Sequence, residues 1–205
     1  YSLETSSTVY DTKLGNVTST TNYGAAPELG LVESTVLDAT GLALRSTSTY
    51  ESPNTSGSYL RQLSTTLPGG TTTNYAYYGA TEVIDNPCTT NVVEAFRQGG
   101  QLRLKTDPDP DGAGTKVGRV TETIYDDSGA IVATRYNAEA WTCNTYDVRG
   151  RTVSAVIPAY NGSGARTVSN NYAVGGNPLV TSTTDSAGTM MVETDLLGRV
   201  TSYTE

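Results

Sequence analysis

The sequence contains no histidine, and this absence excludes several kinds of active site. Serine–histidine–aspartate catalysis, cysteine–histidine catalysis, histidine-bound zinc and the usual proton shuttle at neutral pH all require an imidazole. Carboxylate pairs could still hydrolyse glycosides, for which two carboxyl groups must face each other at roughly 5–10 Å. The prominent aspartates recur instead at turn positions, where binding backbone N–H groups is a sufficient reason for them. We therefore predict a non-catalytic chain without a cofactor.

Charged residues and long apolar runs are also scarce. Charged side chains make up 17% of the 205 residues, and the net charge is −8. The lysines and arginines form no basic run, which disfavours nucleic acid and anionic membrane surfaces as partners. No apolar run approaches the roughly 18 residues that indicate a spanning helix, so no membrane insertion is expected. The low charge also separates this chain from typical disordered sequences.

Phenylalanine and tryptophan occur once each, against fourteen tyrosines. A tyrosine buries a large ring while its hydroxyl still needs a partner or water. This composition suits a sheet that is packed on one face and wet on the other. The alternative is a carbohydrate- or receptor-binding extracellular β module, with exposed tyrosines such as Tyr75 and Tyr77 as its binding face.

Cysteine occurs only twice, at Cys88 and Cys143. Abundant Thr, Ser, Asn and Tyr with little Lys suggest a secreted chain, in which the two cysteines are expected to form a disulfide. Such a bond would close a loop of about 55 residues and contribute at most about 4 kcal/mol in the chain-entropy model. The alternative is two separate buried thiols that act as small apolar side chains.

One short sequence motif recurs along the chain: Tyr or Thr, then Asp, two further residues and Gly. The Asp is the first residue of a turn and accepts a backbone N–H, and the Gly is the fourth and supplies a positive φ. The motif therefore predicts a tight hairpin turn with a bulge. The flanking residues, such as 119–125 and 131–136, are rich in β-branched and aromatic side chains and predict strands. The four turns are Asp126 to Gly129, Asp147 to Gly150, Asp185 to Gly188 and Asp195 to Gly198.

Successive copies of this motif are separated by multiples of about ten residues, which is typical of strand-and-turn arrays. We expect roughly 15 to 20 short strands. The fold class predicted is all-β, an array of antiparallel β-hairpins spanning residues 1–205 without an internal domain boundary. The repeats are clearest over residues 115–205, and the abrupt ends lead us to expect a fragment of a longer array.

The segments 146–153 and 195–200 resemble the YD repeats of bacterial Rhs proteins, toxin-complex shells and teneurins. In that family, consecutive hairpins form a strip that spirals into a hollow shell. The resemblance implies a non-catalytic structural segment of a secreted or cell-surface protein, used for toxin encapsulation or adhesion. Its implied partners are neighbouring repeats of the same polypeptide, an encapsulated toxin or a surface glycan or receptor. Thr replaces Tyr before Asp185 and Asp195, and Ala130 stands where Arg is usual.

An arginine follows the turn glycine at Arg151 and Arg199, and Arg119 follows Gly118. The shared position suggests that each arginine pairs with a carboxylate on a neighbouring repeat.

One acidic loop is a candidate calcium site. Asp107, Asp109 and Asp111 occupy every second position and are followed by Gly112, as at the start of an EF-hand loop. The twelfth position is Gly118, where that loop needs a bidentate Glu. The alternative is an exposed acidic turn stiffened by two prolines.

Overall fold

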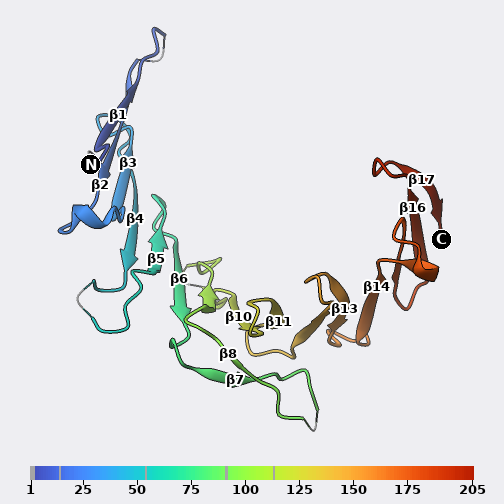
Figure 1. The fold of residues 1–205 in the computed structure, drawn as a ribbon. Coiled ribbons are helices and arrows are strands. Elements are labelled where there is room, and N and C mark those ends of the chain that lie inside the picture. Colours follow the sequence, from blue (N-terminus) through green and yellow to red (C-terminus); the bar gives the residue numbers. More distant parts are fainter. Residues whose placement is uncertain (1–2, 14, 54, 91, 113) are drawn as a thin grey trace. The chain divides into compact units, whose positions relative to one another are not determined.

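The computed structural model describes residues 3–13, 15–53, 55–90, 92–112 and 114–205. These residues form seventeen β-strands and two short 3-10 helices, with no α-helix among them (Figure 1). Neighbouring strands pair antiparallel, as β10 with β11 and β12 with β13, so the predicted all-β hairpin array is confirmed. The chain divides into two compact units, Tyr1–Tyr77 with Leu102–Val120, and Tyr78–Gln101 with Thr121–Glu205. The interpretation of residues 1–205 as one uninterrupted array stays a prediction.

The first unit is a run of adjacent antiparallel strands, joined mostly by short turns. The sheet order follows the sequence until β6, whose next neighbour is β9. A 3-10 helix, Pro27–Leu29, lies between β2 and β3. The strands are β1 (Ser6–Val9), β2 (Val17–Asn22), β3 (Ser34–Leu37), β4 (Leu44–Tyr50), β5 (Gln62–Thr66), β6 (Thr72–Tyr77) and β9 (Leu102–Thr106).

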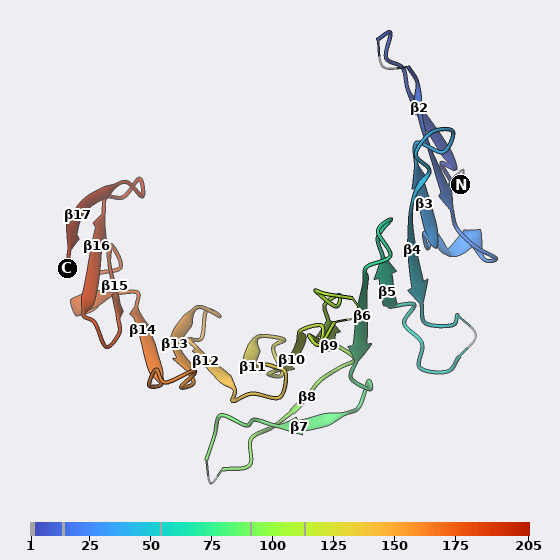
Figure 2. The ribbon, with the colours of Figure 1, turned by 180° about the vertical axis from the view of Figure 1, so that it is seen from behind.

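The second unit contains the clearest sequence repeats, and its strands pair in sequence order, as Figure 2 shows for β14 to β17. A separate two-stranded sheet, β7 (Val83–Asp85) with β8 (Ala95–Arg97), precedes this run in the chain. A 3-10 helix, Val174–Gly176, lies between β14 and β15. The other strands are β10 (Val120–Tyr125), β11 (Ile131–Tyr136), β12 (Thr142–Tyr146), β13 (Thr152–Ile157), β14 (Arg166–Asn171), β15 (Val180–Thr184), β16 (Thr189–Thr194) and β17 (Val200–Thr204).

Few side chains are fully buried. The buried apolar residues of the described chain are Tyr78, Ile124, Val132 and Ala133, all in the second unit. Ile84, Cys88, Phe96, Trp141 and Tyr146 pack against the cluster of Ile124, Val132 and Ala133. The β7–β8 hairpin therefore supplies the second layer over this part of the sheet. Elsewhere the strands rely on their neighbours, since a core of this size covers only a few of them.

No helix in the described part of the chain has the length and apolar character needed to span a membrane.

Candidate functional site

The repeated turns share one hydrogen-bond pattern. Asp126 Oδ1 accepts the N–H groups of Ser128 and Ala130, each at 2.9 Å. Asp147 and Asp195 accept in the same way from residues two and four positions further on, at 2.9–3.0 Å. The glycine three positions after each of these aspartates has a φ of 76–86°, a region that costs other residues strain. The strand register shifts immediately before each aspartate, so each turn carries a bulge.

The turn from Asp185 to Gly188 is built differently. Asp185 Oδ1 accepts the N–H of Ala187 at 2.8 Å, but Gly188 does not have a positive φ. Thr184 and Thr189 pair directly, and the register does not shift between β15 and β16. A four-residue loop closes this hairpin without a bulge. The positive φ that the motif predicts for Gly188 is therefore not needed there.

Tyrosine hydroxyls close the open ends of the hairpins, a contact that we call the tyrosine clasp. Tyr146 ends β12 and donates its hydroxyl to the carbonyl of Ile131, the first residue of β11, at 2.6 Å. Tyr172, just after β14, donates to the carbonyl of Thr152, the first residue of β13, at 2.9 Å. Equivalent bonds join Tyr23 to Glu4 at 3.1 Å, Tyr50 to Val32 at 3.0 Å and Tyr77 to Gln62 at 2.7 Å.

At one of the two positions where threonine replaces tyrosine, Thr194, the threonine takes over the clasp. Thr194 ends β16 and donates its Oγ1 hydroxyl to the carbonyl of Leu179, just before β15, at 3.4 Å. The backbone N–H of Thr194 also donates to this carbonyl at 2.9 Å. The hydroxyl is thus the shared feature of the two residue types at this position.

The arginines after the turn glycines pair within their own turns, which corrects the expectation for two of them. Arg151 contacts Asp147 and Arg199 contacts Asp195, each at 2.7 Å. Arg119 contacts Asp107 at 3.0 Å, and these two residues are the last and the first of the loop between β9 and β10. Because each arginine lies four positions after the capping aspartate, its guanidinium can fold back onto that carboxylate. It pairs there and not with a carboxylate of a neighbouring repeat.

Arg151 does contact the next hairpin, but through an aromatic ring. Its guanidinium lies 4.2 Å from the centre of the Tyr172 ring, the ring of a tyrosine clasp. Arg61 likewise lies 4.5 Å from the ring centre of Tyr77, another clasp residue. Each arginine precedes the residue whose carbonyl accepts the clasp hydroxyl. The recurring unit is therefore a carboxylate, an arginine and a clasp tyrosine.

The pKa values of the turn carboxyls are lowered by the groups that they cap. The backbone N–H of Arg151, followed by its guanidinium, lowers the pKa of Asp147. The backbone N–H and guanidinium of Arg199 lower the pKa of Asp195 in the same way. At Asp126 burial acts to raise the pKa, but hydrogen bonds from Ser128 and the backbone N–H of Ala130 outweigh it and lower the value. All three carboxylates are charged at neutral pH.

Two buried residues at the base of the β7–β8 hairpin were not singled out from the sequence. Tyr78, 1% exposed, donates its hydroxyl to the carbonyl of Thr123 in β10 at 2.9 Å. Gln98, 0% exposed, donates its amide N–H to the carbonyl of Tyr125 at 2.9 Å and accepts the N–H of Tyr125 at 3.0 Å. The side-chain amide of Gln98 thus replaces the backbone of a neighbouring strand.

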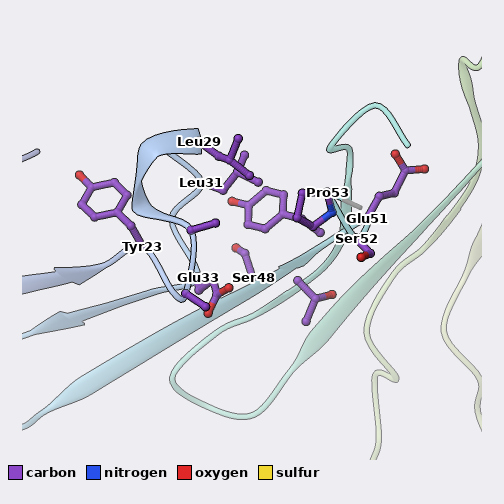
Figure 3. A pocket seen from close by; sticks show the side chains of 12 residues that line it. Tyr23, Leu29, Leu31, Glu33, Ser48, Glu51, Ser52 and Pro53 are labelled. Carbon is purple, nitrogen blue, oxygen red and sulfur yellow. The ribbon is translucent and has the colours of Figure 1, made fainter. Parts of the chain in front are cut away.

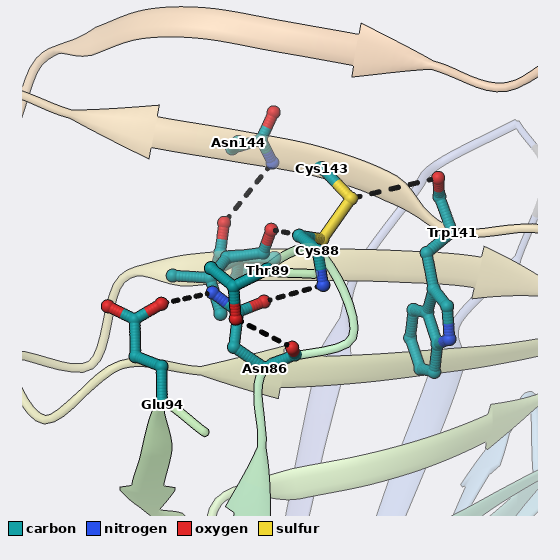
Figure 4. The surroundings of a disulfide bond; sticks show 9 residues. Asn86, Cys88, Thr89, Glu94, Trp141, Cys143 and Asn144 are labelled. Atoms are coloured by element: carbon teal, nitrogen blue, oxygen red, sulfur yellow. Dashed lines mark hydrogen bonds between the residues drawn. A yellow bond between two sulfur atoms is a disulfide. The ribbon is translucent and has the colours of Figure 1, made fainter. Parts of the chain in front are cut away.

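A disulfide joins the outer part of this hairpin to β12. Cys88 and Cys143 are bonded, as the two cysteines predicted (Figure 4). Asn86 holds the Cys88 loop, because its Oδ1 accepts the N–H of Cys88 at 3.0 Å and its Nδ2 donates to Glu94 at 2.9 Å. The hairpin is therefore fixed at its base by Tyr78 and Gln98 and further out by the disulfide.

A surface cavity of about 720 Å³ lies beside the disulfide, and we call it the stapled groove. Its apolar lining includes Phe96, Val132 and Tyr146, and its charged lining consists of Glu94, Asp126 and Asp147. No lysine or arginine is among the residues that line it in the described structure. Burial raises the pKa of the Tyr146 hydroxyl, and the nearby Asp126 carboxylate raises it further.

A second cavity, of about 360 Å³, lies in the first unit between the Pro27–Leu29 helix and the end of β4. Its lining includes Tyr50 together with Leu29, Leu31 and Pro53, the last three of which are labelled in Figure 3. The hydroxyls of Tyr23 and Tyr50 are both engaged in tyrosine clasps. The cavity thus combines apolar and aromatic surface with a polar lining of Glu33, Ser48, Thr49, Glu51 and Ser52.

The acidic loop uses its carboxylates within the chain. Asp107 contacts Lys105 at 2.7 Å, and Asp109 Oδ1 accepts the N–H groups of Asp111 and Gly112 at 3.1 Å. Asp111 Oδ2 accepts the N–H of Lys116 at 3.3 Å. Within the described ranges, no group of three or more Asp, Glu, Cys or His residues is placed to hold a metal ion. Calcium binding by Asp107, Asp109 and Asp111 stays a prediction.

Comparison with known proteins gives similarity only among solved structures. No protein-family model matches the chain, and no curated protein matches it. The chain is similar to one in the crystal structure of TcdB2-TccC3-Cdc42, with 14% identity and a TM-score of 0.43 over 91% of this chain. It is also similar to one in the crystal structure of TcdB2-TccC3-TEV, with 13% identity and a TM-score of 0.45 over 92% of this chain. It covers 11% of the length of each of those chains.

Proposed function

We propose that this chain is a non-catalytic structural segment of a secreted or cell-surface YD/Rhs-repeat protein. It forms part of a β-shell or scaffold, which encloses a toxin or presents an adhesion surface. The observation that carries this proposal is a repeated arrangement, in which an aspartate turn lies directly beside the tyrosine clasps of the strands that it joins. Because each unit is closed by its own residues and packs on its neighbours, an array can grow without one central core.

Two further features support a secreted scaffold. The Cys88–Cys143 disulfide is the kind of bond that persists in oxidising compartments. The repeated aspartates are used to cap turns, and their partners are backbone N–H groups and arginines of the same chain. Because these carboxylates are used within the chain, they fit the proposal that the main partners of each repeat are the neighbouring repeats of the same polypeptide.

The tyrosines favour the scaffold over a sugar-binding face. Tyr77 donates its hydroxyl to the carbonyl of Gln62, and the guanidinium of Arg61 lies over one face of its ring, so both the hydroxyl and one ring face are used within the chain. Within the described part of the chain, at least six tyrosines donate their hydroxyls to backbone carbonyls, which is a structural use of the residue.

Small-angle X-ray scattering across a concentration series tests the scaffold proposal. A compact chain of 205 residues should have a radius of gyration of roughly 17 Å. We expect a clearly larger, concentration-independent value, as an open strip of hairpins requires. A value near 17 Å would indicate a closed domain and contradict the proposal.

A further inference from the structure

The turn at Asp126 lacks a partner that its two sister turns possess. At Asp147 and Asp195, the residue four positions on is an arginine whose guanidinium contacts the aspartate at 2.7 Å. At Asp126 that position is Ala130, and the backbone pattern of the turn is otherwise the same. Within the described residues, no lysine or arginine forms an ion pair with Asp126, whose hydrogen bonds are all with its own turn.

The position of the missing guanidinium lies beside an open cavity. Asp126, Ala130 and the clasp residue Tyr146 all line the stapled groove. In the sister turn, Arg151 lies between the Asp147 carboxylate and the ring of the clasp residue Tyr172. Asp126 and Tyr146 are the equivalents of Asp147 and Tyr172, so the groove presents the same two surfaces without the arginine between them.

The remaining walls suit the rest of a polypeptide ligand. Phe96 and Val132 supply apolar surface, and Glu94 adds a second half-buried carboxylate without adding a cation to the lining. The disulfide and Gln98 fix the hairpin wall in place before any ligand arrives, which lowers the entropic cost of binding. A cavity of about 720 Å³ is within the size range of pockets that hold several ligand groups.

We propose that the stapled groove binds an arginine side chain of a polypeptide partner, with its guanidinium between the Asp126 carboxylate and the Tyr146 ring. Arginine is favoured over lysine because its planar fork both pairs with a carboxylate and stacks on an aromatic ring. The contact would reproduce in trans the arrangement that Arg151 makes in cis. This inference does not depend on the scaffold proposal, because it concerns the chemistry of one groove.

The test is a titration of the whole chain with capped peptides, followed by amide chemical shifts in NMR. The probe is Ac-Gly-Leu-Arg-Leu-Gly-amide, and the matched probe carries Lys in place of Arg. We expect the Arg peptide to shift the Ser128 and Ala130 amides and to bind at least five-fold more tightly than the Lys peptide. N-acetyl-arginine amide should bind at least ten-fold more weakly than the peptide. Equal binding of all three probes, or none up to millimolar concentration, overturns the proposal.

Two variants locate the site. Asp126→Asn keeps an oxygen for the turn N–H groups but removes the charge, and should weaken the Arg peptide at least ten-fold. Asp195→Asn is the control, because it makes the same change in a turn with its own arginine, and should leave binding unchanged.

Ala130→Arg supplies the guanidinium in cis. It should abolish peptide binding and raise the thermal midpoint of the chain. Unchanged peptide binding by both Asp126→Asn and Ala130→Arg, with the folded NMR spectrum retained, contradicts the assignment of the groove.

Discussion

At the scale of single residues, the side-chain amide of Gln98 is a contact whose loss should be costly. It is fully buried and pairs with both the backbone N–H and the backbone C=O of Tyr125. Gln98→Leu removes these two bonds, together with the amide's bond to the carbonyl of Phe96, and leaves the backbone N–H and C=O of Tyr125 without their side-chain partner. We expect a loss of about 3 kcal/mol in the free energy of unfolding, measured by urea denaturation.

Gln98→Glu provides a matched variant of nearly the same size. At neutral pH it places a charge in a buried site and should destabilise at least as strongly as Leu. A protonated carboxyl can both donate and accept, so the deficit relative to the parent chain should shrink at pH 4. A deficit that does not depend on pH would contradict the role of the amide.

The tyrosine clasp predicts a difference between two conservative substitutions. Tyr172→Phe keeps the ring under Arg151 but removes the hydroxyl bond to Thr152, and should cost about 1 kcal/mol of unfolding free energy. Tyr160→Phe changes an exposed tyrosine, 67% accessible, and serves as the control with no measurable effect. Equal urea midpoints for the two variants would mean that the hydroxyl bond contributes nothing.

At the scale of elements, the β7–β8 hairpin is attached at two separate places, so its attachments should be separable. Replacing Cys88 and Cys143 by Ser removes the crosslink, with an expected loss of at most about 4 kcal/mol in the free energy of unfolding. The base contacts of Tyr78 and Gln98 remain, so the variant should still fold. Adding a reductant should lower the urea midpoint of the parent chain and leave that of the variant unchanged.

The same hairpin shows what the sequence could predict and what it could not. The turns at Asp126 and Asp147 follow from local residues, because their hydrogen bonds span two to four positions. The disulfide follows from there being only two cysteines. Gln98 could not be identified, since its partner lies 27 residues away and no pattern marks it. The partner of Arg151 was misassigned because a shared position in a repeat says nothing about the direction in which a long side chain turns.

At the scale of the whole molecule, stability depends on many half-exposed contacts more than on a core. The buried apolar side chains described in the structure are few and lie in the second unit. Hydrogen-bonded and ion-paired carboxylates are in contrast found in both units, at Glu51 and Asp107 in the first and at Asp126, Asp147 and Asp195 in the second. The protonation of these groups should therefore affect the entire chain.

Stability should fall as the solution is acidified, and Glu51 gives the clearest case. Its side-chain hydrogen bond with Arg61 is the largest influence on a pKa that is lowered to about 2, against an ordinary value of 4.5. Because the unfolded chain binds this proton first, the contribution is fully present above pH 4.5 and is lost as pH falls toward 2. Urea unfolding at pH 7, 5, 4 and 3 should show this decline.

The Glu51→Gln variant should be less stable than the parent chain at pH 7, and its free energy of unfolding should fall less steeply below pH 5. Parallel pH profiles of the two chains would show that Glu51 does not contribute to the acid sensitivity.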